Sequence, residues 1–265
     1  MGITRQNYYA RRKARQRRRV DADLVVALVI AERQIQPRLG TRKLHFMLKG
    51  VLIKEGVLLG RDRFLEVLRQ ADLLLAPKPA EYPCTTNSHH SLPVFSNRIK
   101  GLAVSQPNEV WVGDLTYVRP AMGFLFLALL TDKVSRKVVG YHCGDTLEAG
   151  GCLAALQQAV AEMPVGATPI HHSDQGTQYC CHEYVNWVVD HGLSVSMTET
   201  DHCAENALAE RVNGILKSEY GLGGEFKTKA VGRLAVDQAI HLYNTRRPHT
   251  ALGYRTPQEA HRLAA

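Results

Sequence analysis

The chain has 265 residues, of which 45% are hydrophobic and 22% charged, and its formal net charge is +8. This composition is typical of a soluble globular protein and excludes a disordered or fibrous one. No apolar run approaches the ~18 residues that a membrane span needs, and no apolar segment follows the basic N-terminus as in a secretory signal. We therefore expect a cytoplasmic protein with no membrane partner.

The charge is distributed unevenly along the chain. Residues 1–19 carry eight basic and no acidic side chains, whereas residues 104–210 carry four basic and thirteen acidic ones. Residues 36–103 and 211–265 are again basic. Because Lys and Arg side chains that neutralise phosphates release counterions, basic flanks favour a polyanionic partner such as DNA. A solvated basic surface is the alternative, and charge alone does not separate the two.

The first part of the chain is expected to be a basic arm over residues 1–20. Such a segment has little to bury, so it is either disordered or a helix that is ordered only on a partner. From Asp21 to about Gln34, apolar residues recur at helical spacing and predict a first helix.

Two further amphipathic helices are predicted over residues 41–48 and 61–70. Three short helices with turns and an excess of basic residues favour a helix-turn-helix-like DNA-binding module over residues 21–75. A plain three-helix bundle with a basic surface is the alternative. The side chains expected to contact DNA in this module are Arg42, Lys43, Arg61 and Arg63.

Residues 76–103 contain four prolines among polar residues and are predicted to be a linker. The periodicity of the remaining chain predicts strands over 109–118, 123–131, 137–143, 168–172 and 193–197, and helices over 148–163, 178–191, 204–220 and 229–243. This order indicates an α/β fold, with a mixed sheet covered by helices on both faces. We expect a core over 104–225, followed by a C-terminal helix and basic tail over 226–265.

Three acidic residues stand out in this core. Asp114 lies within a predicted strand (WVGDLTYV), Asp174 directly follows another (HHSDQGTQY), and Glu210 lies on a predicted helix opposite its apolar stripe. Carboxylates that converge repel one another and are tolerated best around a divalent cation. A turn or cap role for the aspartates and a solvated position for the glutamate are the alternatives.

The spacing of the acids and their context resemble a known family, because 35 residues separate Asp174 from Glu210. The matching segments are GITRQNYYARR, QPRLGTRKLHFML, PNEVWVGDLTYV, HSDQGTQY, ENALAERVNGILKSEY and YNTRRPHTALGYRTPQEA. By these motifs the chain is identified as a member of the IS-three family of bacterial insertion-sequence transposases, as the product of the second reading frame. Asp114, Asp174 and Glu210 match the DDE triad of retroviral-integrase-like transposases.

The resemblance implies an RNase H-like core and a DDE polynucleotidyl transferase whose triad binds Mg²⁺ or Mn²⁺, as two ions. It implies cleavage and strand transfer of insertion-sequence ends into target DNA. The implied partners are DNA, further copies of the chain on that DNA, and the upstream-frame product, by fusion or binding. An RNase H-like nuclease and a non-catalytic DNA-binding regulator of transposition are the alternatives.

Further residues are candidates for contacts around the triad. Lys217 lies two turns after Glu210 and is expected to contact a phosphate, while Asn206 lies one turn before it and is expected to orient it or contact DNA. His172 and Gln175 flank Asp174 as supporting groups, with a structural histidine as the alternative. The C-terminal cluster YNTRRPH adds two expected DNA contacts, Arg246 and Arg247, for which helix termination and packing are the alternative.

Overall fold

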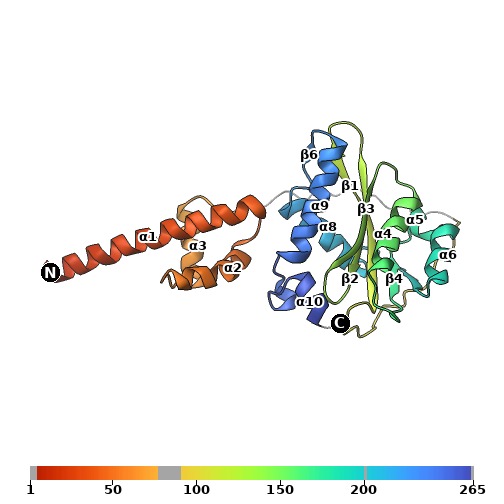
Figure 1. The fold of residues 1–265 in the computed structure, drawn as a ribbon, viewed down its shortest axis with the longest axis horizontal. Coiled ribbons are helices and arrows are strands. Elements are labelled where there is room, and N and C mark those ends of the chain that lie inside the picture. Colours follow the sequence, from red (N-terminus) through yellow and green to blue (C-terminus); the bar gives the residue numbers. More distant parts are fainter. Residues whose placement is uncertain (1–4, 77–90, 200–201, 264–265) are drawn as a thin grey trace. The chain divides into compact units, whose positions relative to one another are not determined.

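The computed structural model describes residues 5–76, 91–199 and 202–263. The chain divides into two compact units, Met1–Pro79 and Ala80–Ala265 (Figure 1). The first half of the predicted linker, residues 77–90, and the first four residues of the predicted arm lie outside the described residues.

The N-terminal unit consists of α1 (Arg5–Ile35), α2 (Thr41–Lys54) and α3 (Arg61–Gln70). Helix α1 begins at Arg5 rather than at Asp21, so the described part of the basic arm and the first predicted helix form one helix. The reason is local: Arg, Lys, Gln and Ala favour helix, and neither Gly nor Pro interrupts this stretch.

The core of this unit lies between the three helices and is wholly apolar at its centre. Val25 and Val29 of α1, Leu44 of α2 and Phe64 and Leu68 of α3 are all inaccessible to solvent. Helix α3 has the range predicted from the sequence, and α2 continues past the predicted end to Lys54. The spacing of apolar residues in the sequence therefore predicts correctly which faces of these helices are buried.

The second unit is built on a mixed sheet in the order β3-β2-β1-β4-β5, with β6 paired to the end of β1. The strands are β1 (Val110–Pro120), β2 (Leu125–Asp132), β3 (Val138–Gly144), β4 (Ile170–Ser173), β5 (Ser194–Met197) and β6 (Glu225–Phe226). The first three strands form an antiparallel meander, and β4 and β5 continue the sheet in parallel to β1. The mixed sheet predicted from the sequence is confirmed.

Helices cover both faces of this sheet (Figure 1). On one face lie α4 (Ala149–Ala161), α5 (Thr177–Cys180) and α6 (His182–Asp190); on the other lie α8 (Ala207–Glu219) and α9 (Lys229–Thr245). Alternate residues of β2 supply the two cores, because successive side chains of a strand point to opposite faces. Ala128 and Leu130 pack with the first group, and Leu127 and Leu129 with the second.

Two predicted helices are interrupted in the structure. The helix predicted over 178–191 is divided into α5 and α6 at Cys181, which is extended with φ −67° and ψ 145°. The helix predicted over 204–220 is divided at Asn206, with φ −113° and ψ 19°, into α7 (His202–Glu205) and α8. Three short elements were not predicted: β6, a 3₁₀ turn at Thr250–Leu252 and α10 (Pro257–Leu263). No helix in the described part of the chain is both long and apolar enough to span a membrane.

Candidate active site

The pairing of β1 with β4 brings two of the predicted acids to the same level of the sheet. The two parallel strands are in register at Val112 and His172, which is the last pair between them. Asp114 and Asp174 each follow this pair by two residues, at the point where the strands separate. Asp174 thus lies at the carboxyl end of β4, a common location for ligand-binding groups, and Asp114 lies beside it within β1.

The turn after β4 holds the Asp174 carboxylate in place. Its Oδ1 accepts a hydrogen bond from the Gly176 amide nitrogen at 3.0 Å. A Cβ at position 176 would lie only 3.0 Å from that same oxygen. A larger residue here would therefore crowd the Asp174 carboxylate, which would have to shift by a few tenths of an ångström.

Helix α8 is joined to β1 by two asparagine side chains. Asn213 Nδ2 donates to Asp114 Oδ2 at 2.6 Å, and Asn206 Nδ2 donates to the Gly113 carbonyl oxygen at 3.0 Å. Both asparagines are buried, with 6% and 3% of their surface exposed. Glu210 lies between them on the same face of the helix, because residues three and four positions apart are neighbours on a helix surface. Its side chain is exposed.

Asn206 therefore has a different role from the one expected. A buried amide that bonds to the β1 backbone is not presented for direct contact with DNA, and the bond between Asn206 and Glu210 is a backbone one, in which the Glu210 amide donates to the Asn206 carbonyl oxygen at 3.3 Å. It positions the start of α8 against β1. Asn213 was not among the residues predicted from the sequence; its bond to Asp114 makes it part of the candidate site, and only the tertiary contact reveals this.

Burial and the neighbouring carboxylates raise the pKa of Asp114. Its pKa is raised to about 7, chiefly by burial, next by the charge of Asp174 and least by the charge of Glu210. The hydrogen bonds from Asn213 and from the Leu115 amide oppose this shift. The charge of Asp174 therefore acts on the pKa of Asp114 more strongly than the charge of Glu210 does.

The carboxylate oxygens of Asp114, Asp174 and Glu210 are suitable ligands for a divalent cation, although the three side chains do not converge on one point. Within the described part of the chain, no three His, Cys, Asp or Glu side chains meet closely enough to hold a metal ion. Asp114 and Asp174 nevertheless repel each other, and a cation between them would relieve this repulsion. Next to them, Asn213 Oδ1 is a buried acceptor with no hydrogen-bond partner among the described residues, a position that suits a water on a hydrated ion.

Lys217 lies one turn beyond Asn213 and borders the same site. Its Nζ is 4.4 Å from the centroid of the Tyr117 ring. Burial lowers the pKa of this lysine, and the charge of Asp114 opposes the shift. The expected phosphate contact of Lys217 stays a prediction, and the position of the side chain beside the carboxylates supports it.

The residues that flank Asp174 have structural roles. His172 is fully buried and its Nδ1 is 2.9 Å from Ser196 Oγ, while burial lowers its pKa to about 4. Gln175 Nε2 donates to the Thr198 carbonyl oxygen at 2.7 Å. Both side chains bind the end of β4 to the end of β5, so they support Asp174 through the backbone.

One of the two predicted DNA contacts in the tail is a packing residue. Arg247 is 2% exposed and donates from Nε and Nη2 to the two carboxylate oxygens of Glu219, each at 2.8 Å. Its Nη1 is 2.8 Å from His249 Nε2. This arginine therefore joins the tail to the end of α8, whereas its neighbour Arg246 is exposed and stays a predicted DNA contact.

The basic residues of the N-terminal unit remain candidates for DNA contact. Arg42, Arg61 and Arg63 are exposed and Lys43 is half-buried. Arg61 Nε lies 3.1 Å from Asp62 Oδ1, an exposed pair that solvent screens.

Comparison with known proteins identifies relatives over the whole chain. Two models described as integrase core domain match residues 104–203 and 191–257. The insertion element IS600 uncharacterized 31 kDa protein of Shigella sonnei is 32% identical over 272 residues, which is 100% of this chain and 98% of that protein. The transposase for insertion sequence element IS629 of Shigella sonnei is 31% identical, covering 79% of this chain and 70% of its own length.

A further relative is the transposase InsF for insertion sequence IS3A of Escherichia coli strain K12, which is 34% identical over 64% of this chain and 60% of its own length. Among solved structures, a simian T-cell lymphotropic virus intasome in complex with a PP2A regulatory subunit matches 84% of this chain and 74% of the compared chain, at 19% identity and a TM-score of 0.51. This likeness confirms the predicted RNase H-like integrase fold.

Proposed function

The chain belongs to the IS-three (IS3) family of insertion-sequence transposases and carries their integrase core, and we propose that Asp114, Asp174 and Glu210 catalyse its joining of DNA strands. The observation that supports this assignment is the register of β1 and β4, which brings Asp114 and Asp174 to the same level beneath α8. Glu210 is the only carboxylate that the described part of α8 presents on the face that carries Asn206 and Asn213.

Each residue of the site has a distinct proposed role in phosphodiester chemistry. Asp114 and Asp174 would hold a divalent cation, Mg²⁺ or Mn²⁺, with Glu210 as the third carboxylate and a candidate ligand of a second ion. When bound, such ions activate the attacking oxygen and stabilise the leaving oxygen of a phosphodiester. Asn213 orients Asp114 and, by donating to Oδ2, favours the ionised carboxylate that a cation needs. Lys217 binds a DNA phosphate beside them.

DNA is the proposed substrate at both the insertion-sequence end and the target. The site region is net acidic, so the basic segments outside it must hold the phosphates. The exposed basic face of α1 and the arginines of α2 and α3 make the N-terminal unit the proposed DNA-binding module. Action as an oligomer on DNA, and fusion with or binding to the upstream-frame product, belong to the same proposal.

A joining assay tests the triad. The purified chain is mixed with a pre-cut insertion-sequence end and target DNA in Mg²⁺, and joined product is measured for the parent, Asp174→Asn and Glu210→Gln. We expect both variants to lose at least about a thousandfold, because each removes charge from the proposed cation site. Glu183→Gln, an exposed acid on α6, is the matched control and should join as the parent does.

Joining by either triad variant at the parental rate would show that the assignment is wrong. Cleavage of an RNA–DNA hybrid without joining of DNA ends would favour the RNase H-like nuclease instead.

A further inference from the structure

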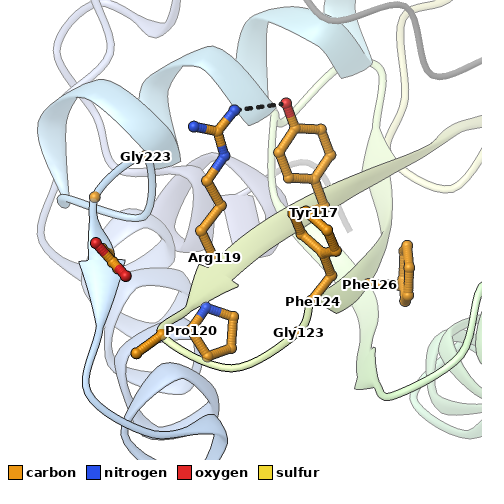
Figure 2. A pocket seen from close by; sticks show the side chains of 10 residues that line it. Tyr117, Arg119, Pro120, Gly123, Phe124, Phe126 and Gly223 are labelled. Atoms are coloured by element: carbon orange, nitrogen blue, oxygen red, sulfur yellow. Dashed lines mark hydrogen bonds between the residues drawn. The ribbon is translucent and has the colours of Figure 1, made fainter.

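A pocket lies at the carboxyl end of β1, beyond the candidate active site. It has a volume of about 700 Å³ and is formed by the β1–β2 hairpin and the segment that leads into β6 (Figure 2). Its lining residues are Tyr117, Arg119, Pro120, Ala121, Gly123, Phe124, Phe126, Gly223, Gly224 and Glu225.

Three aromatic rings form the wall of this pocket. Tyr117 and Phe126 face each other as a cross-strand pair between β1 and β2. The Phe124 ring meets the Tyr117 ring edge to face, with centroids 5.8 Å apart. Phe124 is 51% exposed, so a large apolar ring is presented to solvent at a hairpin tip. Such a surface is suited to a flat partner that stacks.

Two cations border the same rings. The Arg119 guanidinium carbon is 5.4 Å from the Tyr117 centroid, and its Nη2 donates to the tyrosine hydroxyl at 3.4 Å, as Figure 2 shows. Lys217 Nζ is 4.4 Å from the same centroid. Glu225 is the one acid in the lining. Aromatic rings beside cations are the combination by which proteins bind single-stranded nucleic acid.

Helix α8 links this pocket to the candidate active site. Asn213 contacts Asp114, and Lys217, four residues later on the same face, contacts Tyr117. A DNA strand whose phosphate lies on Lys217 would therefore have one neighbouring nucleotide at the carboxylates and another at the pocket.

We propose that this pocket binds one unpaired base of the DNA strand that enters the active site, stacked on the Phe124 ring and edge to face with the Tyr117 ring, with its phosphates on Arg119 and Lys217. The proposal rests on the proposed function of the neighbouring site. The base must be unpaired because a base within a duplex is already stacked on both faces and cannot enter. The pocket would hold the strand near its reacting end and favour frayed or single-stranded ends over blunt duplex.

The test measures DNA binding without catalysis. The full chain is titrated, in a chelator, into a fluorescent duplex that carries a short single-stranded tail and into the same duplex with a blunt end. Phe124→Ala should weaken binding of the tailed duplex by roughly tenfold, because the base no longer has this ring to stack on, and leave the blunt duplex unchanged. Met122→Ala is the matched control: Met122 is 83% exposed in the same hairpin but does not line the pocket.

An abasic scan of the tail locates the base. At one position, removal of the base should weaken binding by the parent about as much as Phe124→Ala does, and the two changes together should add nothing. Arg119→Gln provides a second variant on an exposed side chain and should weaken binding of the tailed duplex several-fold.

Equal affinity of the parent, Phe124→Ala and Arg119→Gln for the tailed duplex would overturn the proposal. So would a change of oligomeric state on Phe124→Ala with unaltered affinity, because the hairpin would then be a contact between copies of the chain. The joining assay separates this failure from that of the proposed function: loss of joining in Asp174→Asn supports the active site whatever the pocket binds.

Discussion

Asn213 donates a hydrogen bond from Nδ2 to Asp114 Oδ2 across 2.6 Å, and this contact joins the helix that carries Glu210 to the strand that carries Asp114. The bond acts on both position and charge, because it fixes the carboxylate and favours its ionised form. Asn213 is therefore a positioning residue for the proposed chemistry.

Asn213→Ala should lower the rate of DNA joining roughly tenfold to a hundredfold, since misplacement of a reacting group is costly. It should also move the acidic limb of the pH–rate profile to higher pH, because the variant lacks the hydrogen bond that lowers the pKa of Asp114. Joining rates across pH 5 to 9 measure both effects. Asn186→Ala, an exposed asparagine on α6, should change neither. A reduced rate with an unmoved profile would mean that Asn213 affects the position of Asp114 but not its ionisation, and an unchanged rate would contradict both roles.

Asp114→Asn should stabilise the fold in the absence of divalent cations, and more so at pH 8 than at pH 5. The pKa of Asp114 is raised from 3.8 to about 7 on folding, so its stabilising contribution is complete below pH 3.8 and is lost as pH rises through about 7. Asparagine cannot ionise, and its single side-chain oxygen keeps one of the two hydrogen bonds that the carboxylate accepts, from Asn213 or from the Leu115 amide.

The gain in the free energy of unfolding should be on the order of 1–3 kcal/mol at pH 8. Urea titrations of both proteins in a chelator at the two pH values measure it. The exposed Asp190→Asn is the control, and a gain independent of pH would contradict the explanation.

Arg247→Ala should destabilise the second unit by about 3 kcal/mol, because it leaves the Glu219 carboxylate without its bidentate partner in a largely buried position. Arg246→Ala should change stability by less than about 0.5 kcal/mol, since its side chain is exposed, and should instead weaken DNA binding. Thermal unfolding and DNA titration of the two variants separate the roles. Equal stability of the two variants would show that the Glu219 pair contributes little.

Gly140→Ala should disrupt the packing of α4 on β3. A Cβ at this position would lie 2.1 Å from the Ala155 carbonyl oxygen and 2.9 Å from the Ala159 Cβ, so strand and helix must separate. We expect a loss of at least about 3 kcal/mol of unfolding free energy. Gly150→Ala on α4 meets nothing within 4 Å and should be neutral or stabilising by up to about 1 kcal/mol. Unfolding curves that rank the two variants in the opposite order would contradict this packing.

Deletion of residues 1–19 should weaken DNA binding and reduce its dependence on salt. This segment carries eight basic and no acidic side chains, and its described side chains are all exposed. For each phosphate that the shortened chain no longer neutralises, the slope of log affinity against log salt should fall by about 0.9. Titrations at several salt concentrations measure the slope, and an unchanged slope would show that the segment does not bind phosphates.

Periodicity alone was enough to predict most of the fold. The strands that contain Asp114 and precede Asp174 lie within one or two residues of their predicted ranges, because alternation and apolar runs depend on burial of a face. The helix breaks at Cys181 and Asn206 were not predicted, because neither position is a Gly or a Pro. At Asn206 the side chain instead bonds to the Gly113 carbonyl oxygen, a contact that depends on the tertiary structure. The two-residue strand β6 is likewise a product of its pairing with β1.

The sequence by itself determined the fold class, the family and the three candidate carboxylates, because these depend on residue types at particular spacings. Only the tertiary structure decided which polar side chains surround them. Arg246 and Arg247 are adjacent and chemically identical, yet one is exposed and the other is buried against Glu219. The contacts of Asn213 with Asp114 and of Lys217 with Tyr117 likewise depend on how α8 packs against β1, and spacing along one chain cannot specify the distance between two elements.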